Sequence, residues 1–95
     1  MGKPNLQKAL NLALDGAYGD ERIESIHALA RFGNDATQAL YIVAMRGAWG
    51  DERKIAIEHL GKIPLEISGD LLQEIAMNGH AGDERLLAIK FLRNK

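Results

Sequence analysis

The chain has 95 residues, with 12 basic and 13 acidic side chains and no cysteine. The length fits one domain spanning residues 1–95, and a composition that is 46% apolar and 26% charged excludes wholesale disorder and a collagen-like chain. The balanced charge argues against a protein that binds nucleic acid or an anionic membrane, because such proteins rely on clustered cations. Without cysteine there is no disulfide framework, thiol nucleophile or thiolate metal site.

No segment is apolar enough to cross a bilayer. The longest apolar run, residues 39–45, has seven residues, whereas a helical span needs roughly 20. The opening Met1-Gly2-Lys3-Pro4 lacks the apolar core of a secretion signal. We therefore expect a soluble cytoplasmic protein.

A four-residue motif recurs three times along the chain. Gly-Asp-Glu-Arg occupies residues 19–22, 50–53 and 82–85, so that its copies are 31 and 32 residues apart. Four further positions align in all three copies, and they are occupied by Ala13, Ala44 and Ala76; Gly16, Gly47 and Gly79; Ile26, Ile57 and Ile89; and Leu29, Leu60 and Leu92. Such periodic identity indicates tandem structural repeats.

Each repeat predicts two helices. Residues 4–15 form the opening helix, which ends at Gly16. The three motifs then each open a helix, with Asp20, Asp51 and Asp83 as N-caps, and these helices run to about residues 32, 62 and 93. Their apolar residues follow helical spacing.

Two further helices lie between the motifs. In the first, Asp35 and Gln38 have capping-box spacing, and the helix runs to Arg46 and ends at a left-handed Gly47. The second covers the segment from Pro64 to residue 78, where Asp70 begins a weaker capping-box pattern. No segment alternates with a period of two residues, so we predict six helices and no strand.

A single pair of helices cannot bury its apolar stripe, so the pairs must stack. The prediction is an all-α fold, a short right-handed α-solenoid of about three two-helix repeats. The motif Asp51-Glu52-Arg53, followed by Ala56-Ile57 and Leu60-Gly61, resembles the first helix of a HEAT-type repeat. The resemblance runs from Asn5 to Leu92 and is similar to the short HEAT repeats of phycobilisome-lyase-type proteins.

The motif arginines occupy an unfavourable place. A cation in the first turn of a helix opposes the helix dipole, and the chain makes this choice three times. We expect a structural ladder in which each arginine reaches an aspartate or a carbonyl in the adjacent repeat, and the HEAT resemblance implies the same. The ladder residues are Asp20, Arg22, Asp51, Arg53, Asp83 and Arg85.

A metal site is the alternative reading of these aspartates. Packed helices lie about 8–10 Å apart, whereas ligands of a calcium ion each lie about 2.3–2.6 Å from it, so carboxylates repeated once per unit are too dispersed. His27 and His59 lie on neighbouring helices but out of register, and we interpret them as surface residues. We predict no metal and no cofactor.

Several side chains are candidates for contact with a partner. Tyr18 and Trp49 occupy equivalent loop positions, where they either cover their own helix ends or anchor a partner. The last helix is apolar around most of its circumference, and Leu87 and Phe91 either pack back on the preceding helix or dock with another chain. The HEAT resemblance implies that the second helices of the repeats line a concave face that binds partners, and on that face we single out Arg46 and Met77.

The leading hypothesis is a non-catalytic protein–protein interaction module or small scaffold, which is not an enzyme. It would bind its partner through the concave helices, the aromatic loops or the last helix. The partner is another protein, which could be a second copy in a homodimer, rather than a nucleic acid or a membrane. The alternative, implied by the family resemblance alone, is a lyase-like chaperone or enzyme accessory protein.

Overall fold

The computed structural model describes residues 5–94, and all regular elements in that range are helical. The expectation of an all-α chain with six α-helices and no strand is therefore confirmed for these residues, whereas the predicted start at Pro4 lies outside them. One 3-10 turn, η1 (Gly33–Ala36), separates the second and third helices. The helices are α1 (Leu6–Asp15), α2 (Gly19–Ala30), α3 (Thr37–Arg46), α4 (Gly50–Gly61), α5 (Leu65–Asn78) and α6 (Gly82–Arg93).

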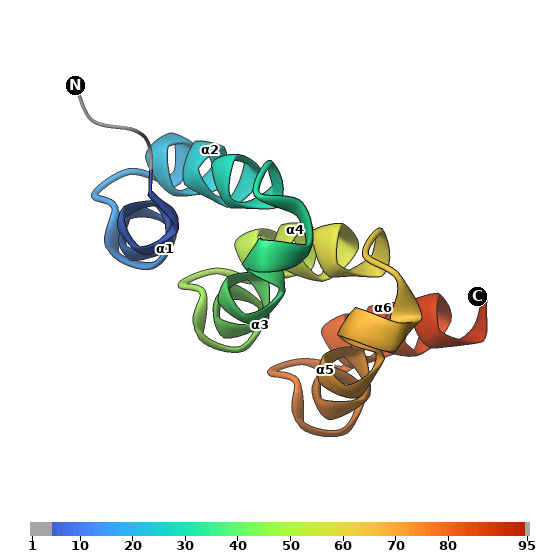
Figure 1. Ribbon diagram of the computed structural model, residues 1–95. Helices are drawn as coiled ribbons and strands as arrows, with labels where there is room; N and C mark the ends of the chain where they lie inside the picture. Colours follow the sequence, from blue (N-terminus) through green and yellow to red (C-terminus); the bar gives the residue numbers. More distant parts are fainter. Residues whose placement is uncertain (1–4, 95) are drawn as a thin grey trace.

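The helices pack as three consecutive pairs arranged in two layers (Figure 1). Within each pair the partners are sequence neighbours: α1 with α2, α3 with α4, and α5 with α6. Between pairs, α4 contacts both α2 and α6 in one layer, while α3 contacts both α1 and α5 in the other. The result is an elongated molecule of 42 × 25 × 15 Å, with the first and last helix pairs at its opposite ends.

The repeated apolar positions form the core between these pairs. Ile26 and Ile57 are completely buried, as are Leu29 and Leu60, because a following helix pair covers each of them. In the third repeat no pair follows within the described residues, and Ile89 is 36% exposed. The same side chain is therefore core in the middle of the stack and surface at its end.

The predicted N-caps are wrong by two residues. The three motif helices begin at the motif glycines, and their N-cap residues are Tyr18, Trp49 and Ala81, none of which makes a side-chain capping hydrogen bond. Each motif aspartate instead lies inside the first turn, where a carboxylate interacts favourably with the positive end of the helix dipole.

The predicted starts of α3 and α5 are also corrected. Asp35 lies within η1, and α3 begins only at Thr37, whose Oγ1 donates to the Asn34 carbonyl over 2.6 Å. Helix α5 starts at Leu65, directly after Pro64, so that Asp70 stands in mid-helix rather than at a cap. In both places a tight turn before the helix, rather than a capping side chain, sets where it begins.

The loop glycines are required for space rather than for a left-handed conformation. Gly47 has a φ of −55°, and Gly33 is the single described residue with positive φ. A Cβ on Gly47 would lie 2.8 Å from the Val43 carbonyl oxygen and 3.0 Å from Cγ of Arg53. The predicted left-handed Gly47 is therefore wrong, and its lack of a side chain lets the arginine pass close to the helix end.

No helix within residues 5–94 has the length and apolar character that a bilayer-spanning segment needs.

The contact between α4 and α6 makes a first prediction. A Cβ on Gly61 would overlap the ring of Phe91, so Gly61→Ala should lower the free energy of unfolding by about 1–3 kcal/mol through overpacking. This loss should occur although alanine has the higher helix propensity. Urea denaturation measures it.

Gly69→Ala in α5 is the matched control. A Cβ there would meet only the Leu65 side chain at an ordinary 3.9 Å, so the gain in helix propensity of about 0.5–1 kcal/mol should appear unopposed. Equal stabilisation by both substitutions would contradict the close packing of Phe91 on Gly61.

Candidate functional site

The motif arginines join successive helix pairs. Nε of Arg22 donates to Oε1 of Glu52 over 2.8 Å, and Nη2 donates to Oε2 over 3.2 Å. The remaining nitrogen, Nη1, donates to the Gly16 carbonyl over 2.8 Å, so that the same side chain also holds the loop before its own helix. The hydrogen bond to Glu52 raises the pKa of the Arg22 guanidinium above its ordinary value.

The second junction repeats this geometry. Arg53 makes the same two bonds to Glu84, at 2.8 and 3.2 Å, and the same bond to the carbonyl of Gly47. The side chains of Glu52 and Glu84 retain only 5% and 2% of their accessible surface. Burial and bidentate geometry make these charge-assisted bonds strong and specific in direction.

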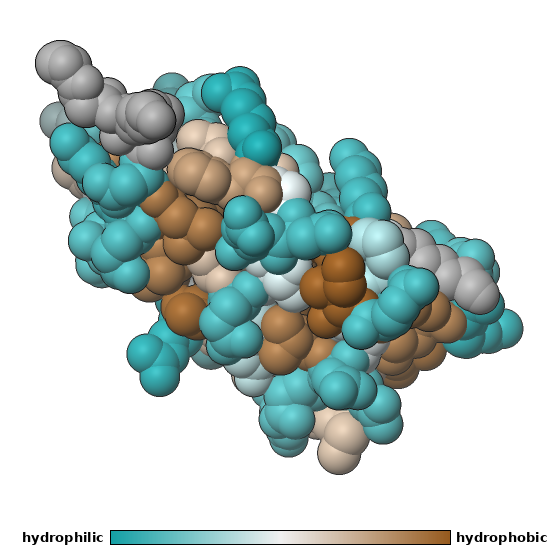
Figure 2. Space-filling view, viewed as in Figure 1, coloured by the Kyte–Doolittle hydropathy of each residue, from teal (hydrophilic) through white to brown (hydrophobic). Residues whose placement is uncertain are grey.

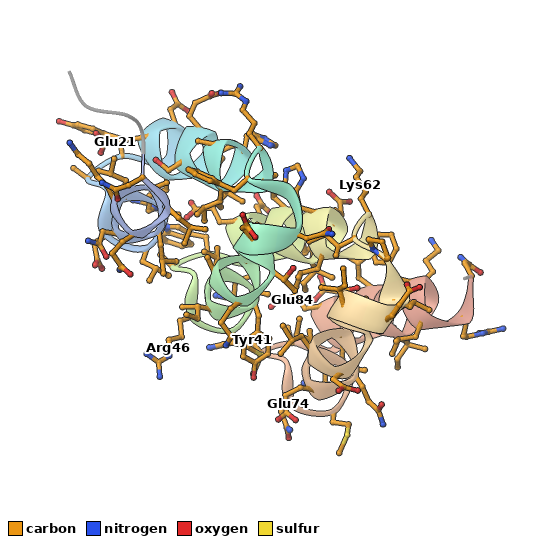
Figure 3. All side chains as sticks on the ribbon, in the orientation of Figure 1. Glu21, Tyr41, Arg46, Lys62, Glu74 and Glu84 are labelled. Carbon is orange, nitrogen blue, oxygen red and sulfur yellow. The ribbon has the colours of Figure 1, made fainter. Side chains whose placement is uncertain are left out.

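Arg85 keeps only half of this arrangement. Its Nη1 donates to the Gly79 carbonyl over 2.8 Å, as in the other two repeats. No carboxylate within residues 5–94 binds its Nε or Nη2. At the opposite end, Glu21 binds no arginine of the described residues, and its Oε1 accepts from the Ala17 backbone over 2.8 Å. Figure 3 labels Glu21 at one end of the stack and Glu84 within it.

The predicted aspartate partners of the arginines are therefore wrong. The acceptors are the motif glutamates of the next repeat, and the carbonyls belong to each arginine's own loop. Asp83 pairs with Lys54 instead, an exposed contact that lowers the pKa of the Asp83 carboxyl and raises that of the Lys54 ammonium. Asp20 and Asp51 are exposed.

Two aromatic side chains project from the loops that the arginines hold. Tyr18 is 74% exposed and Trp49 is 64% exposed, so neither covers its helix end. The loops at 16–18, 47–49 and 79–81 lie on the same side of the molecule, one step apart (Figure 1). The chain thus carries exposed aromatic rings at equivalent places on successive repeats.

The remaining candidate partner-binding residues differ in their exposure to solvent. Met77 is 67% exposed, and Arg46 projects into solvent from the last turn of α3 (Figure 3). Phe91 and Leu87, in contrast, are partly buried against the core, with the ring of Phe91 on the backbone of Gly61. Of the two alternatives for this pair, both side chains pack back on the protein, although the ring of Phe91 lies on α4 rather than on the preceding helix α5. The exposed residues are Leu86 and Ile89.

The structure brings the two out-of-register histidines together. Nδ1 of His27 and Nε2 of His59 are 2.9 Å apart, and the rings meet edge to face with centroids 5.0 Å apart. Burial, with His27 as a second cause, lowers the pKa of His59. Among the described residues no group of three or more histidine, cysteine, aspartate or glutamate side chains is placed to hold a metal ion.

A signal for these contacts is present in the sequence. Neighbouring residues on a helix point about 100° apart, so the adjacent glutamate and arginine of one motif can face opposite neighbours. The offset of one position between His27 and His59 likewise joins a forward-facing to a backward-facing side chain. In both pairings the two partners occupy different positions of their repeats, so an alignment of equivalent positions does not reveal them.

Three surface hollows among the described residues lie at the ends of the stack. One is lined by Ala9, Ala28, Arg31 and Phe32, and a smaller one beside it is lined by Asn5, Lys8, Leu12 and Ser25 along with Ala9 and Ala28. A third, at the opposite end, is lined by Leu86, Ile89, Lys90, Arg93 and Asn94. In the view of Figure 2, hydrophobic residues form separate patches divided by hydrophilic ones.

Compared with protein-family models, curated proteins and solved structures, the chain shows no significant match in any of the three.

The buried rung between Arg53 and Glu84 predicts a position-dependent loss of stability. Glu84→Ala should lower the free energy of unfolding by about 3 kcal/mol, because it leaves a largely buried guanidinium uncompensated. Glu21→Ala removes the same motif residue where it binds no arginine, so its cost should stay below about 1 kcal/mol. Urea denaturation of both variants measures the difference, and equal losses would contradict the ladder.

The histidine pair predicts acid sensitivity. Because the folded-state pKa of His59 lies below its ordinary value of 6.5, the unfolded chain binds the proton more readily. The stabilisation is therefore complete above the ordinary pKa and is lost as pH falls through it toward the lower folded-state value.

The expected result is a lower urea midpoint at about pH 5.5 than at about pH 7.5. His59→Phe, which copies the aromatic residue of the third repeat, should reduce this drop. His80→Ala, in an exposed loop, should leave it unchanged. A wild-type midpoint that is constant across this range would overturn the role assigned to the pair.

Proposed function

We propose that the chain is a non-catalytic protein–protein interaction module, built as a short right-handed α-solenoid of HEAT-like repeats. The repeated motif, the three stacked helix pairs and the recurring arginine–glutamate rungs support this architecture. The proposal includes a cytoplasmic location and no cofactor. It assigns Glu52, Glu84 and their arginines to the junctions between helix pairs rather than to chemistry.

The observation that carries the proposal is the exposure of Tyr18 and Trp49. Large apolar rings are costly to leave in water, and tyrosine and tryptophan dominate the binding energy of protein interfaces. Here two of them recur at one structural position on adjacent repeats, with 74% and 64% of their surface accessible. Together they offer a partner two anchors on one edge of the molecule.

The loops that carry these rings are held before any partner arrives. Arg22 and Arg53 each bind the carbonyl of the glycine two residues before the aromatic residue. A surface that is already ordered loses less conformational entropy on binding, so more of the contact energy appears as affinity. The loop edge therefore has the rigidity expected of a recognition surface.

The charge beside the rings indicates the chemistry of the partner. Asp20 and Asp51 are exposed and each follows its aromatic residue by two positions. A partner segment with apolar pockets or side chains for the rings, flanked by lysine or arginine, would match both features. We therefore assign the loop edge to a basic, apolar-containing protein surface.

The test compares binding by matched variants. Immobilised wild-type chain should retain a protein from an extract of the organism that encodes it. The double variant Tyr18→Ala/Trp49→Ala should bind that protein at least about thirtyfold more weakly, because each interface anchor contributes about 1–2 kcal/mol or more. Ile67→Ala, which removes an exposed apolar side chain of α5 away from the loops, should bind like wild type.

Fluorescence then locates the contact on the purified partner. Trp49 is the sole tryptophan of the chain, and its emission should shift to shorter wavelength when a partner covers the ring. Retention that is the same for wild type and the double variant, with no spectral shift, would refute the loop edge as the binding surface.

A further inference from the structure

The two ends of the stack expose residues that are core elsewhere. At one end, Ile89 is 36% exposed although its equivalents Ile26 and Ile57 are completely buried. At the other end, Leu12 is 40% exposed, whereas Val43 and Ile75 at the same repeat position are completely buried. Each end therefore has the apolar surface of a junction without the neighbouring helix pair.

The charged pair of a junction is also divided between the two ends, with the arginine at one end and the glutamate at the other. Arg85 presents Nε and Nη2, the nitrogens that in Arg22 and Arg53 bind a glutamate of the next pair. Glu21 occupies the motif position of Glu52 and Glu84 but has no arginine in front of it among residues 5–94. The arginine therefore lacks its carboxylate at one end, and at the other end the equivalent glutamate binds only the Ala17 backbone, through Oε1.

We name the two surfaces by the helix that contributes most. The α6 face consists of Arg85, Leu86, Ile89, Lys90 and Arg93. The α2 face consists of Glu21, Glu24, Ser25 and Ala28, with Lys8 and Leu12 of α1.

The charges of these two faces are complementary. The α6 face carries three cations and no acid, because Glu84 and Asp83 point to the preceding pair, where they bind Arg53 and Lys54. The α2 face carries two carboxylates and one lysine, the exposed Asp20 lies beside it, and Arg31 lines the adjoining hollow, so acids outnumber cations by one at this end. A cationic and an anionic apolar surface attract each other, whereas two α6 faces brought together would repel.

We propose that a second copy of this chain stacks head to tail on the α6 face, with its Glu21 bound to Arg85 in the geometry of the internal rungs. The stacking extends the repeat architecture proposed above and does not involve the aromatic loops. Ser25 of the incoming copy takes the position that Ala56 and Ala88 hold at the internal junctions, where a small buried side chain lets the helices approach. Ile89 is then covered as its internal equivalents Ile26 and Ile57 are.

The symmetry of this contact determines its products. Two different faces meet, so each dimer keeps one free α6 face and one free α2 face, and association continues into open-ended chains. A two-fold dimer would instead stop at two copies. The weight-average mass therefore distinguishes the two arrangements.

The experiment is sedimentation equilibrium of the 95-residue chain from micromolar to millimolar concentration, at low and high salt. The mass of wild type should rise past that of two chains without a plateau, and it should fall when salt screens the rung. Arg85→Glu and Glu21→Arg should each weaken association at least about tenfold by placing like charges in the rung. Lys62→Glu makes the same charge change in the middle of the stack and should associate like wild type.

Mixing the two charge-reversed variants provides the decisive measurement. In each variant alone, positions 85 and 21 of neighbouring copies carry like charges. In the mixture, every contact between the two different variants joins opposite charges at these positions. The mixture should therefore regain masses above two chains. Circular dichroism melting shows whether each variant folds. If Arg85→Glu does not, Ile89→Lys replaces it, since it leaves the Gly79 bond intact and should weaken association similarly. Its mixture with Glu21→Arg should then stop at two chains, because only one of the two contacts joins Arg85 to Glu21.

Three outcomes would overturn the proposal: a wild-type chain that stays monomeric throughout, a mass that levels at two chains, or a mixture that fails to associate although both variants are folded. The loop-edge variant Tyr18→Ala/Trp49→Ala should keep its self-association, and Arg85→Glu should keep its binding to the loop-edge partner. Failure of one proposal is therefore visible without failure of the other.

Discussion

The buried arginine–glutamate rung is the interaction on which the arrangement of this protein depends. A single guanidinium bridges two helix pairs through a bidentate contact and also fixes the loop before its own helix. Its position in the first turn opposes the helix dipole, and the facing glutamate together with the glycine carbonyl offsets that cost. Because the geometry is bidentate, the rung sets the register between pairs as well as holding them together.

Close approach of the helices is the condition for this rung. Gly47 leaves room for the Arg53 side chain at the end of α3, and Gly61 lets the ring of Phe91 lie on the α4 backbone. Ala56 and Ala88 are completely buried where the helices face each other. Small residues at these points and charged residues at the rung are therefore parts of the same junction.

A repeated junction has direct consequences for the surface. The loops that it orders carry the exposed Tyr18 and Trp49, so the rigidity of the core extends to the edge proposed for recognition. The ends of the stack present the two unmatched halves of a junction, with Arg85 on one side and Glu21 on the other. The proposed recognition edge and the proposed self-association thus both follow from the same junction, which is complete in the middle of the chain and incomplete at the two ends of the stack.

The sequence by itself determined the three repeats, the six helices and the positions that become core, because helical periodicity and the recurring motif are local properties of the chain. Residues such as Ile26, Ile57 and Leu60 could be assigned to the interior on that basis alone. The structural role of the motif arginines could also be predicted from the sequence, since a cation in the first turn of a helix opposes the helix dipole and therefore indicates a partner.

Only the tertiary structure decided which residues meet across the junctions. The register between helix pairs placed Glu52, rather than an aspartate, opposite Arg22, and brought His27 to His59. It also covered Phe91 while leaving Leu86 exposed, although both lie on the same apolar helix. A change of one residue along a helix rotates a side chain by about 100°, and the choice of neighbour depends on packing between segments some 30 residues apart, which no local pattern encodes.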